Sequence, residues 1–137
     1  MNPALKVNEV FFSIQGETTR TGIPTVFIRL AECNLRCRYC DTAYAYEKGD
    51  EIELEEIIRR ADSFKCKTAE ITGGEPMIQK NTPELARKLM DSGYTVMIET
   101  NGTVNLSPLP QGVIKIVDIK CPDSGSGGTF LYENLKC

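Results

Sequence analysis

Three cysteines lie within eight residues, in the run Cys33-Asn-Leu-Arg-Cys37-Arg-Tyr-Cys40. The run follows a strand-like segment, Thr25–Leu30, so all three thiols fall on one loop. Thiolates this close in sequence are typical of a zinc or iron–sulfur site. A structural zinc takes four ligands, whereas this neighbourhood supplies three and the chain has no histidine. A four-iron cluster bound by three cysteines leaves one iron open to a small molecule.

Glycines and polar residues follow the other predicted core strands. Because the carboxyl ends of parallel strands meet at one edge of a barrel, we expect these residues to lie beside the cysteine loop. The paired glycines 73 and 74 leave room for a ligand to approach the backbone. The strands and their following segments are Thr68–Thr72 with Gly73–Pro76, Tyr94–Glu99 with Thr100–Gly102, and Val113–Ile119 with Lys120.

The elements that position these residues are read from apolar periodicity. A helix is predicted over Glu53–Phe64, with Asp50 as its N-cap. A second helix is predicted to start with Thr82 as cap and Pro83 in its first turn, and to end near Gly93. Strand and helix alternate, which indicates an α/β fold with a mostly parallel sheet and helices packed outside. This pattern suits part of a TIM-like barrel.

Composition narrows the class of protein. Hydrophobic residues make up 41% of the 137 positions, which is enough for the core of one modest domain. The net charge of −3 argues against nucleic acid as the main partner. No run is long enough to cross a membrane, and the N-terminus lacks a secretory signal, so we expect a cytoplasmic protein. The other cysteines, Cys66, Cys121 and Cys137, are scattered, which does not favour a disulfide framework, and Cys66 is expected in the core.

The cysteine run, with Tyr39 before its last cysteine, and the later Gly73–Pro76 segment together resemble the radical S-adenosylmethionine superfamily. Within it, the chain is similar to the 7-carboxy-7-deazaguanine synthase family. The cysteine motif points to the superfamily, whereas the Gln-Gly-Glu and Cys-Asp-Thr segments point to the synthase. The matching stretches are Phe12–Glu17, Phe27–Leu30, Cys33–Thr42, Glu70–Pro76, Glu99–Gly102 and Asp118–Pro122.

The resemblance implies a single radical S-adenosylmethionine domain over residues 1–137, folded as a partial TIM-like barrel. It implies a lyase that converts 6-carboxy-5,6,7,8-tetrahydropterin to 7-carboxy-7-deazaguanine with loss of ammonia, in the biosynthesis of queuosine-type nucleosides. The implied cofactors are a [4Fe–4S] cluster, S-adenosylmethionine and Mg²⁺. The cofactor radical carries the chemistry and the protein orients and shields it, so no catalytic side chain is implied.

The same resemblance assigns the cofactor contacts. The cluster ligands are Cys33, Cys37 and Cys40, and Thr42 binds Mg²⁺, an ion that favours hard oxygens. Each of three assignments has a plainer alternative: a core aromatic for Tyr39, a turn threonine for Thr42 and a solvated strand end for Lys120. The implied S-adenosylmethionine contacts are Tyr39, Cys40, Asp41, Gly74, Glu75 and Lys120.

Substrate contacts are implied for six residues. Gln15 and Glu17 offer the donors and acceptors that a pterin ring needs. Arg29 lies on an otherwise apolar strand and needs a partner, for which we prefer a substrate carboxylate over a structural salt bridge. The six are Ile14, Gln15, Gly16, Glu17, Arg29 and Thr72.

The chain also departs from the family. Family members continue well past the last matching stretch, so the C-terminal part of the usual fold is expected to be missing or reduced. Thr129–Leu135 reads like the start of that part, and Ser124–Gly128 reads as a flexible loop. Thr18 stands where the family usually has a glycine. The resemblance implies a flavodoxin or ferredoxin as reductant and a second copy of the chain in a homodimer.

Two alternatives stay open at the level of sequence. The first is a radical S-adenosylmethionine activase that generates a glycyl radical on a partner protein, which would not need Gln15, Glu17 or Thr42. The second is a non-catalytic iron–sulfur or zinc protein, which would not cleave S-adenosylmethionine under reduction.

Overall fold

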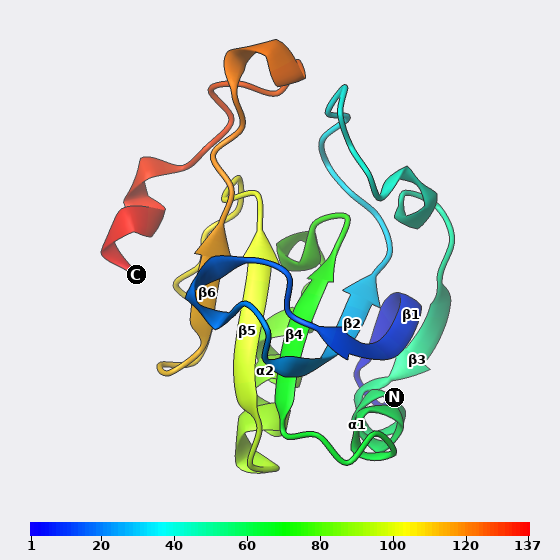
Figure 1. The fold of residues 1–137 in the computed structure, drawn as a ribbon. Helices are drawn as coiled ribbons and strands as arrows, with labels where there is room; N and C mark the ends of the chain where they lie inside the picture. The colour runs from blue at the N-terminus through cyan, green and yellow to red at the C-terminus, as the bar shows by residue number, and fades with distance from the viewer.

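Six strands form one open sheet in the order β3-β1-β2-β4-β5-β6 in the computed structural model, which describes residues 1–137 (Figure 1). Strands β2, β4, β5 and β6 run parallel, whereas β1 is antiparallel to both β2 and β3. The α/β fold of a partial barrel is thus confirmed, with the antiparallel β1 as an addition. The elements are β1 (Ala4–Ile14), β2 (Pro24–Leu30), β3 (Asp50–Glu53), α1 (Leu54–Asp62), β4 (Thr68–Gly73), α2 (Thr82–Asp91), β5 (Thr95–Thr100) and β6 (Ile114–Val117).

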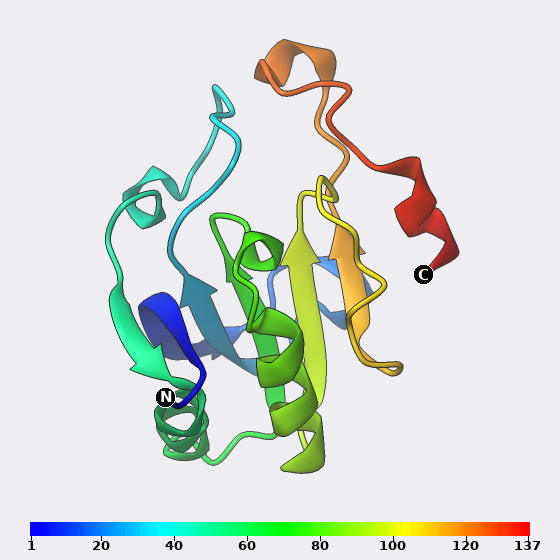
Figure 2. The same cartoon turned by 180° about the vertical axis from the view of Figure 1, so that it is seen from behind.

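Both helices pack on the same face of the sheet, as the view from behind shows (Figure 2). Alternate strand residues such as Ile28, Ile71 and Ile98 are fully buried there. They join the apolar stripes of the helices, including Ile57 and Leu85, in one cluster of 22 buried residues. Burial of this stripe explains the two predicted helices, because an amphipathic helix gains most of its stability from packing. No helix in the structure is both long enough and apolar enough to span a membrane.

The predicted helix starts are wrong in detail. Asp50 is not an N-cap, because Asp50–Glu53 pairs with Ala4–Val7 as strand β3 and buries Ile52. Helix α1 instead starts after Glu53, whose side chain makes no capping bond. Thr82 is the first residue of α2 rather than its cap. Its buried hydroxyl donates to the Pro76 carbonyl at 2.6 Å, which ties the helix start to the turn after β4.

The opposite face of the sheet is crossed by the connection between β1 and β2, drawn in blue in front of β4 to β6 (Figure 1). Gln15 in this connection is 4% exposed, whereas its neighbours Ile14 and Gly16 face solvent. The connection therefore covers part of this face and leaves the carboxyl ends of the parallel strands open.

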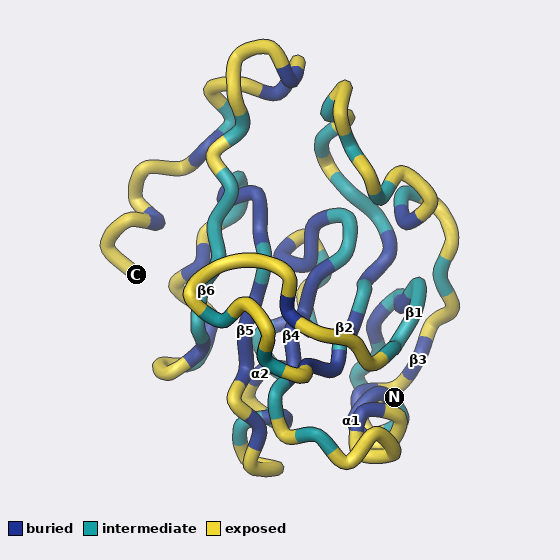
Figure 3. The backbone as a smooth tube through the Cα atoms, viewed as in Figure 1, coloured by how far each residue is buried: buried dark blue, intermediate teal, exposed yellow.

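Two segments rise above those carboxyl ends, one after β2 and one after β6 (Figure 3). They meet where the Arg38 amide donates to the Ser124 carbonyl at 2.9 Å. Ser124 and Ser126 are buried, and the Ser124 hydroxyl donates to the Cys121 carbonyl at 2.6 Å. The segment predicted as a flexible loop is therefore a bonded turn against the cysteine loop.

Candidate functional site

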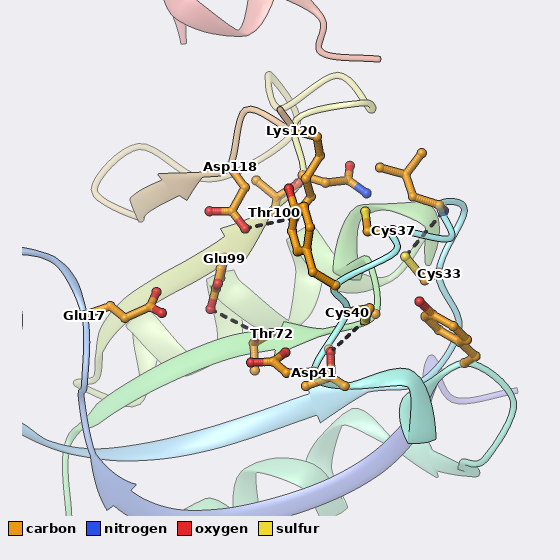
Figure 4. Close-up of a pocket in the computed structure, with 17 residues that line it drawn as sticks. Glu17, Cys33, Cys37, Cys40, Asp41, Thr72, Glu99, Thr100, Asp118 and Lys120 are labelled. Carbon is orange, nitrogen blue, oxygen red and sulfur yellow. Dashed lines mark hydrogen bonds and ion pairs between the residues drawn. The ribbon is translucent and has the colours of Figure 1, made fainter. Parts of the chain in front are cut away.

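A pocket of about 300 Å³ lies at the carboxyl ends of the parallel strands. Its lining comes from the β1–β2 connection, the cysteine loop and the ends of β4, β5 and β6 (Figure 4). The sequence predicts that residues following the parallel strands gather beside the cysteine loop, and the lining of this pocket agrees with that prediction. The predicted site residues that line it are Glu17, Cys33, Cys37, Tyr39, Cys40, Asp41, Thr42, Thr72, Gly74 and Lys120.

The three clustered cysteines all line this pocket as free thiols. No group of three or more cysteine and acidic side chains lies close enough together to hold a single metal ion. Three thiolates are the donor set of a [4Fe–4S] cluster in which each binds a different iron. The donor set therefore fits a cluster with one iron left open toward the pocket.

Hydrogen bonds distinguish the three sulfurs. The Leu35 amide donates to Cys33 Sγ at 3.4 Å, but burial dominates and raises the pKa of the Cys33 thiol. Burial acts the same way on Cys40, yet hydrogen bonds from the Tyr46 and Thr42 side chains outweigh it and lower the pKa of that thiol. The contact with Cys40 raises the pKa of Tyr46 to about 12. Tyr46, which the sequence reasoning missed, thus supports a ligand of the cluster site.

Gly74 brings the end of β4 against the cysteine loop. A Cβ at this position would clash with the Glu32 carbonyl and lie 2.8 Å from Cys33 Cβ. The Gly74 amide donates to the Leu30 carbonyl at 3.2 Å, and the next amide donates to the Glu32 carbonyl at 2.9 Å. The glycine is therefore required for packing of the loop that carries the cysteines, as well as lining the pocket.

Glu75 does not line the pocket, and its role as a cofactor contact stays a prediction. Its side chain is fully buried and accepts hydrogen bonds from the Met77 amide at 3.0 Å, the Thr100 hydroxyl at 2.7 Å and the Asn101 amide at 2.7 Å. Burial raises the pKa of this carboxyl, although the three donors oppose that shift. Glu75 instead joins the turns after β4 and β5.

One wall of the pocket is acidic. Glu99 and Asp118 line it beside the predicted Glu17 (Figure 4). Lys120 pairs with Asp118 at 3.2 Å; burial would lower the pKa of Lys120, but this carboxylate raises it overall. Burial, followed by a hydrogen bond and charge from Glu70, raises the pKa of Glu99 to about 8. Sequence reasoning assigned no role to Glu99 or Asp118, although each opens a matching stretch at a strand end.

Arg29 does not line the pocket, and its preferred substrate role stays a prediction. Glu9 is its direct partner across the antiparallel β1–β2 pair, and Arg29 Nε donates to the Glu9 carboxylate at 2.9 Å. The guanidinium lies 5.8 Å from the Phe11 ring centroid and 5.7 Å from that of Tyr44. The structure thus contains the salt bridge to Glu9, which was the alternative for this arginine.

Of the β1–β2 connection, only Glu17 lines the pocket among the predicted residues. Ile14 and Gly16 are exposed away from it. Gln15 lies beneath it, where its amide nitrogen donates to the Glu70 carboxylate and its amide oxygen accepts from the Glu17 amide at 3.2 Å. Gln15 therefore supports the wall of the pocket from inside the protein.

Comparison with known proteins gives a consistent result. The family model described as the radical SAM superfamily matches residues 28–118. A 7-carboxy-7-deazaguanine synthase from Koribacter versatilis is 44% identical over 133 residues, which cover 96% of this chain and 59% of that protein. The one from Methanospirillum hungatei is 47% identical over 134 residues, covering 96% of this chain and 57% of that protein.

Among solved structures, the crystal structure of QueE from Escherichia coli superimposes with a TM-score of 0.84 at 26% identity, covering 96% of this chain and 67% of that one. The chain spans about three fifths of the length of the two curated relatives described. The matched region includes the three pocket cysteines and the ends of all four parallel strands. The chain therefore belongs to the radical S-adenosylmethionine superfamily.

Proposed function

We propose that this chain catalyses the reaction of a 7-carboxy-7-deazaguanine synthase, the conversion of 6-carboxy-5,6,7,8-tetrahydropterin to 7-carboxy-7-deazaguanine and ammonia. The observation that carries the proposal is a single pocket lined by three free cysteines on one side and by Glu17, Thr72 and Glu99 on the other. A pterin presents ring N–H groups, for which carboxylates are suitable acceptors. The activase alternative has no use for such a wall.

In this proposal Cys33, Cys37 and Cys40 hold a [4Fe–4S] cluster. When bound, the cluster and S-adenosylmethionine supply the one-electron chemistry that removes a hydrogen atom from the substrate. The backbone at Gly74 and the side chain of Lys120 orient S-adenosylmethionine. Tyr39 and Asp41 complete the cofactor contacts.

Substrate is placed against the opposite wall by Glu17 and Thr72. Thr42 supplies a hydroxyl oxygen to Mg²⁺, and the substrate carboxylate supplies another, with water completing the shell. Support for Thr42 comes from its place on the pocket lining, beside Cys40. Positioning of the cofactor and substrate in one pocket supplies much of the rate.

Three further parts of the proposal follow from the family resemblance. All of residues 1–137 form one domain, for which the single core cluster is support. A flavodoxin or ferredoxin donates the electron. Two copies of the chain form a homodimer, which sedimentation analysis of the loaded protein tests directly.

The test is anaerobic reconstitution with iron and sulfide, followed by incubation with dithionite, S-adenosylmethionine, the carboxy-tetrahydropterin and Mg²⁺. Mass analysis is expected to find 7-carboxy-7-deazaguanine in place of the pterin. The Cys37→Ala variant, which removes one proposed cluster ligand from the pocket lining, is expected to form none. Cleavage of S-adenosylmethionine without the deazaguanine product would refute the synthase activity and leave the superfamily chemistry intact.

A further inference from the structure

Glu70 is a buried acid that the proposed reaction does not use. It lies on β4 with only 2% of its surface exposed and does not line the pocket. No salt bridge joins Glu70 to a lysine or arginine in the structure. Its hydrogen-bond partners are the Gln15 amide nitrogen and the Glu99 carboxyl. A negative charge on a buried carboxyl is unfavourable when no cation lies beside it. Hydrogen-bond donors or a shared proton must therefore stabilise the group.

The strand register brings the two acids together. Glu70 on β4 lies opposite Met97 on β5, and Glu99 lies two residues after Met97, so Glu70 and Glu99 are diagonal neighbours on the same face. The Thr72 hydroxyl donates to Glu99 Oε2 at 3.4 Å. The other Glu99 oxygen is then free to face Glu70. Two carboxyl groups in contact cannot both ionise at low cost, so they share a proton.

The bonds decide where that proton sits. The Gln15 amide nitrogen donates to one Glu70 oxygen, so Glu70 is an acceptor on that side. In the contact between the two acids one must donate, and Glu99 is the donor when it carries the shared proton. We propose that Glu70 is a positioning residue that, held by Gln15, keeps the pocket carboxyl of Glu99 protonated at neutral pH.

The other acids around Glu99 also raise its pKa, and the cations Lys120 and Arg29 are already paired with acids. Asp118, after β6, and Glu17, in the β1–β2 connection, are both acidic and raise the pKa of Glu99 less than Glu70 does. The cation nearest this wall, Lys120, is bonded to Asp118. On β2, Arg29 is bonded to Glu9. The pocket thus presents a neutral acid at Glu99.

This inference rests on the proposed function only for its use: a ligand placed against Glu99 would meet a neutral acid whose proton points to Glu70, so it would find acceptor lone pairs without a negative charge. The protonation of Glu99 is a property of the protein alone and needs no ligand. It is measured in the chain alone, with no cluster, cofactor or turnover, so failure of the proposed reaction leaves this test standing.

The experiment follows the Glu99 carboxyl carbon by ¹³C NMR in protein labelled at glutamate side chains, with Glu99→Gln to assign its signal. In the unchanged chain the Glu99 midpoint is expected well above that of an ordinary glutamate. In Glu70→Gln, which keeps the shape and removes the charge, the proton affinity of Glu99 is expected to fall at least tenfold, about one pH unit. Glu17→Gln is the matched control and is expected to shift the midpoint less.

A Glu70→Gln midpoint equal to that of the unchanged chain, or a larger shift from Glu17→Gln, would overturn the inference. Should Glu70→Gln fail to fold, Gln15→Leu gives a second test. Without the amide donor the shared proton is expected to move toward Glu70, so the Glu99 signal takes the ionised position at pH 7. A Glu99 signal that stays protonated in Gln15→Leu would equally contradict the assigned roles.

Discussion

Arg29 and Glu75 illustrate that the type of a residue shows that it needs a hydrogen-bond partner but does not show which group that partner is. A buried arginine needs an acceptor, and both a substrate carboxylate and Glu9 meet that need. Glu9 is the partner in the structure because the β1–β2 register places it directly opposite Arg29. Glu75 is a buried carboxylate that the turn after β5 supplies with two donors, from Thr100 and Asn101. Both side chains therefore help to hold the frame around the pocket.

At this scale, Thr42 provides a test of the magnesium proposal. Thr42→Val keeps the shape of the side chain and removes the hydroxyl oxygen, so Mg²⁺ loses one ligand. We expect product formation to fall on the order of 10–100-fold and the Mg²⁺ concentration for half-maximal rate to rise. Thr42→Ser, which retains the oxygen, is the control. An unchanged Mg²⁺ dependence in Thr42→Val would show that the ion binds elsewhere.

Glu99 makes stability depend on pH. The unfolded chain releases this proton near pH 4.3, whereas the folded chain holds it until about pH 8. Across that interval the folded state binds more protons, so the free energy of unfolding falls as pH rises. Glu99→Gln removes this term. In urea titrations from pH 5 to pH 8, we expect the unchanged chain to lose on the order of 2 kcal/mol more than the variant, after discounting for solvent screening. Parallel pH profiles for the two proteins would exclude such a proton.

The elements around the pocket are joined chiefly through backbone bonds between loops. The turn after β4 binds the end of β2 and the start of the cysteine loop, and that loop binds the turn after β6 through Arg38 and Ser124. The loop that carries the three pocket cysteines is thereby held at two points. Its position depends on close backbone approach, so small changes in volume at the contact should disturb it.

Gly74→Ala tests this dependence. The added methyl meets the Glu32 carbonyl and Cys33, so the cysteine loop must move. We expect a loss of about 1–3 kcal/mol in stability and less than half the iron per chain after reconstitution. Gly16→Ala is the control because a Cβ there meets no atom within 4 Å. Equal iron content in the two variants would mean that the loop tolerates the shift.

On the scale of the whole molecule, the sheet stays open, with β3 and β6 at its edges. The final segment folds back against the β5–β6 connection instead of pairing with β6 (Figure 1). Phe130 packs over Gly102, and the buried Asn134 anchors the segment. Asn134 donates to the Gly102 and Val104 carbonyls at 3.0 and 2.9 Å and accepts from the Leu106 amide at 3.0 Å.

Asn134→Ala should release this segment without unfolding the sheet. Three lost bonds leave buried backbone groups unsatisfied, at a cost of about 1–3 kcal/mol. Hydrogen exchange is expected to speed up at the Leu106 and Leu131 amides and to stay slow at Ile71 in β4. Asn105→Ala, at an exposed side chain that accepts only from Ser107, is the control. Uniform acceleration that includes Ile71 would show that the segment is part of the global core.

Much of the fold was predictable because its signals are local. The apolar stripes of both helices and the runs of β2, β4 and β5 recur with the right period, and each is confirmed within a few residues. The start of α1 was not predictable, because Asp50–Glu53 becomes a strand only by pairing with Ala4–Val7. Likewise, nothing in Ser124–Gly128 indicates its bond to the cysteine loop.

The sequence by itself determined the location of the candidate site: three thiols on one loop, and glycines and polar residues at the ends of parallel strands. These depend on contiguous residues and on the rule that parallel strands end at one edge of a sheet. Only the tertiary structure decided which side chains face the pocket and which support it. Arg29, Glu75 and Gln15 turn to partners 20 to 55 residues away in the chain. Such pairings follow from strand register and burial, which no contiguous stretch of sequence encodes.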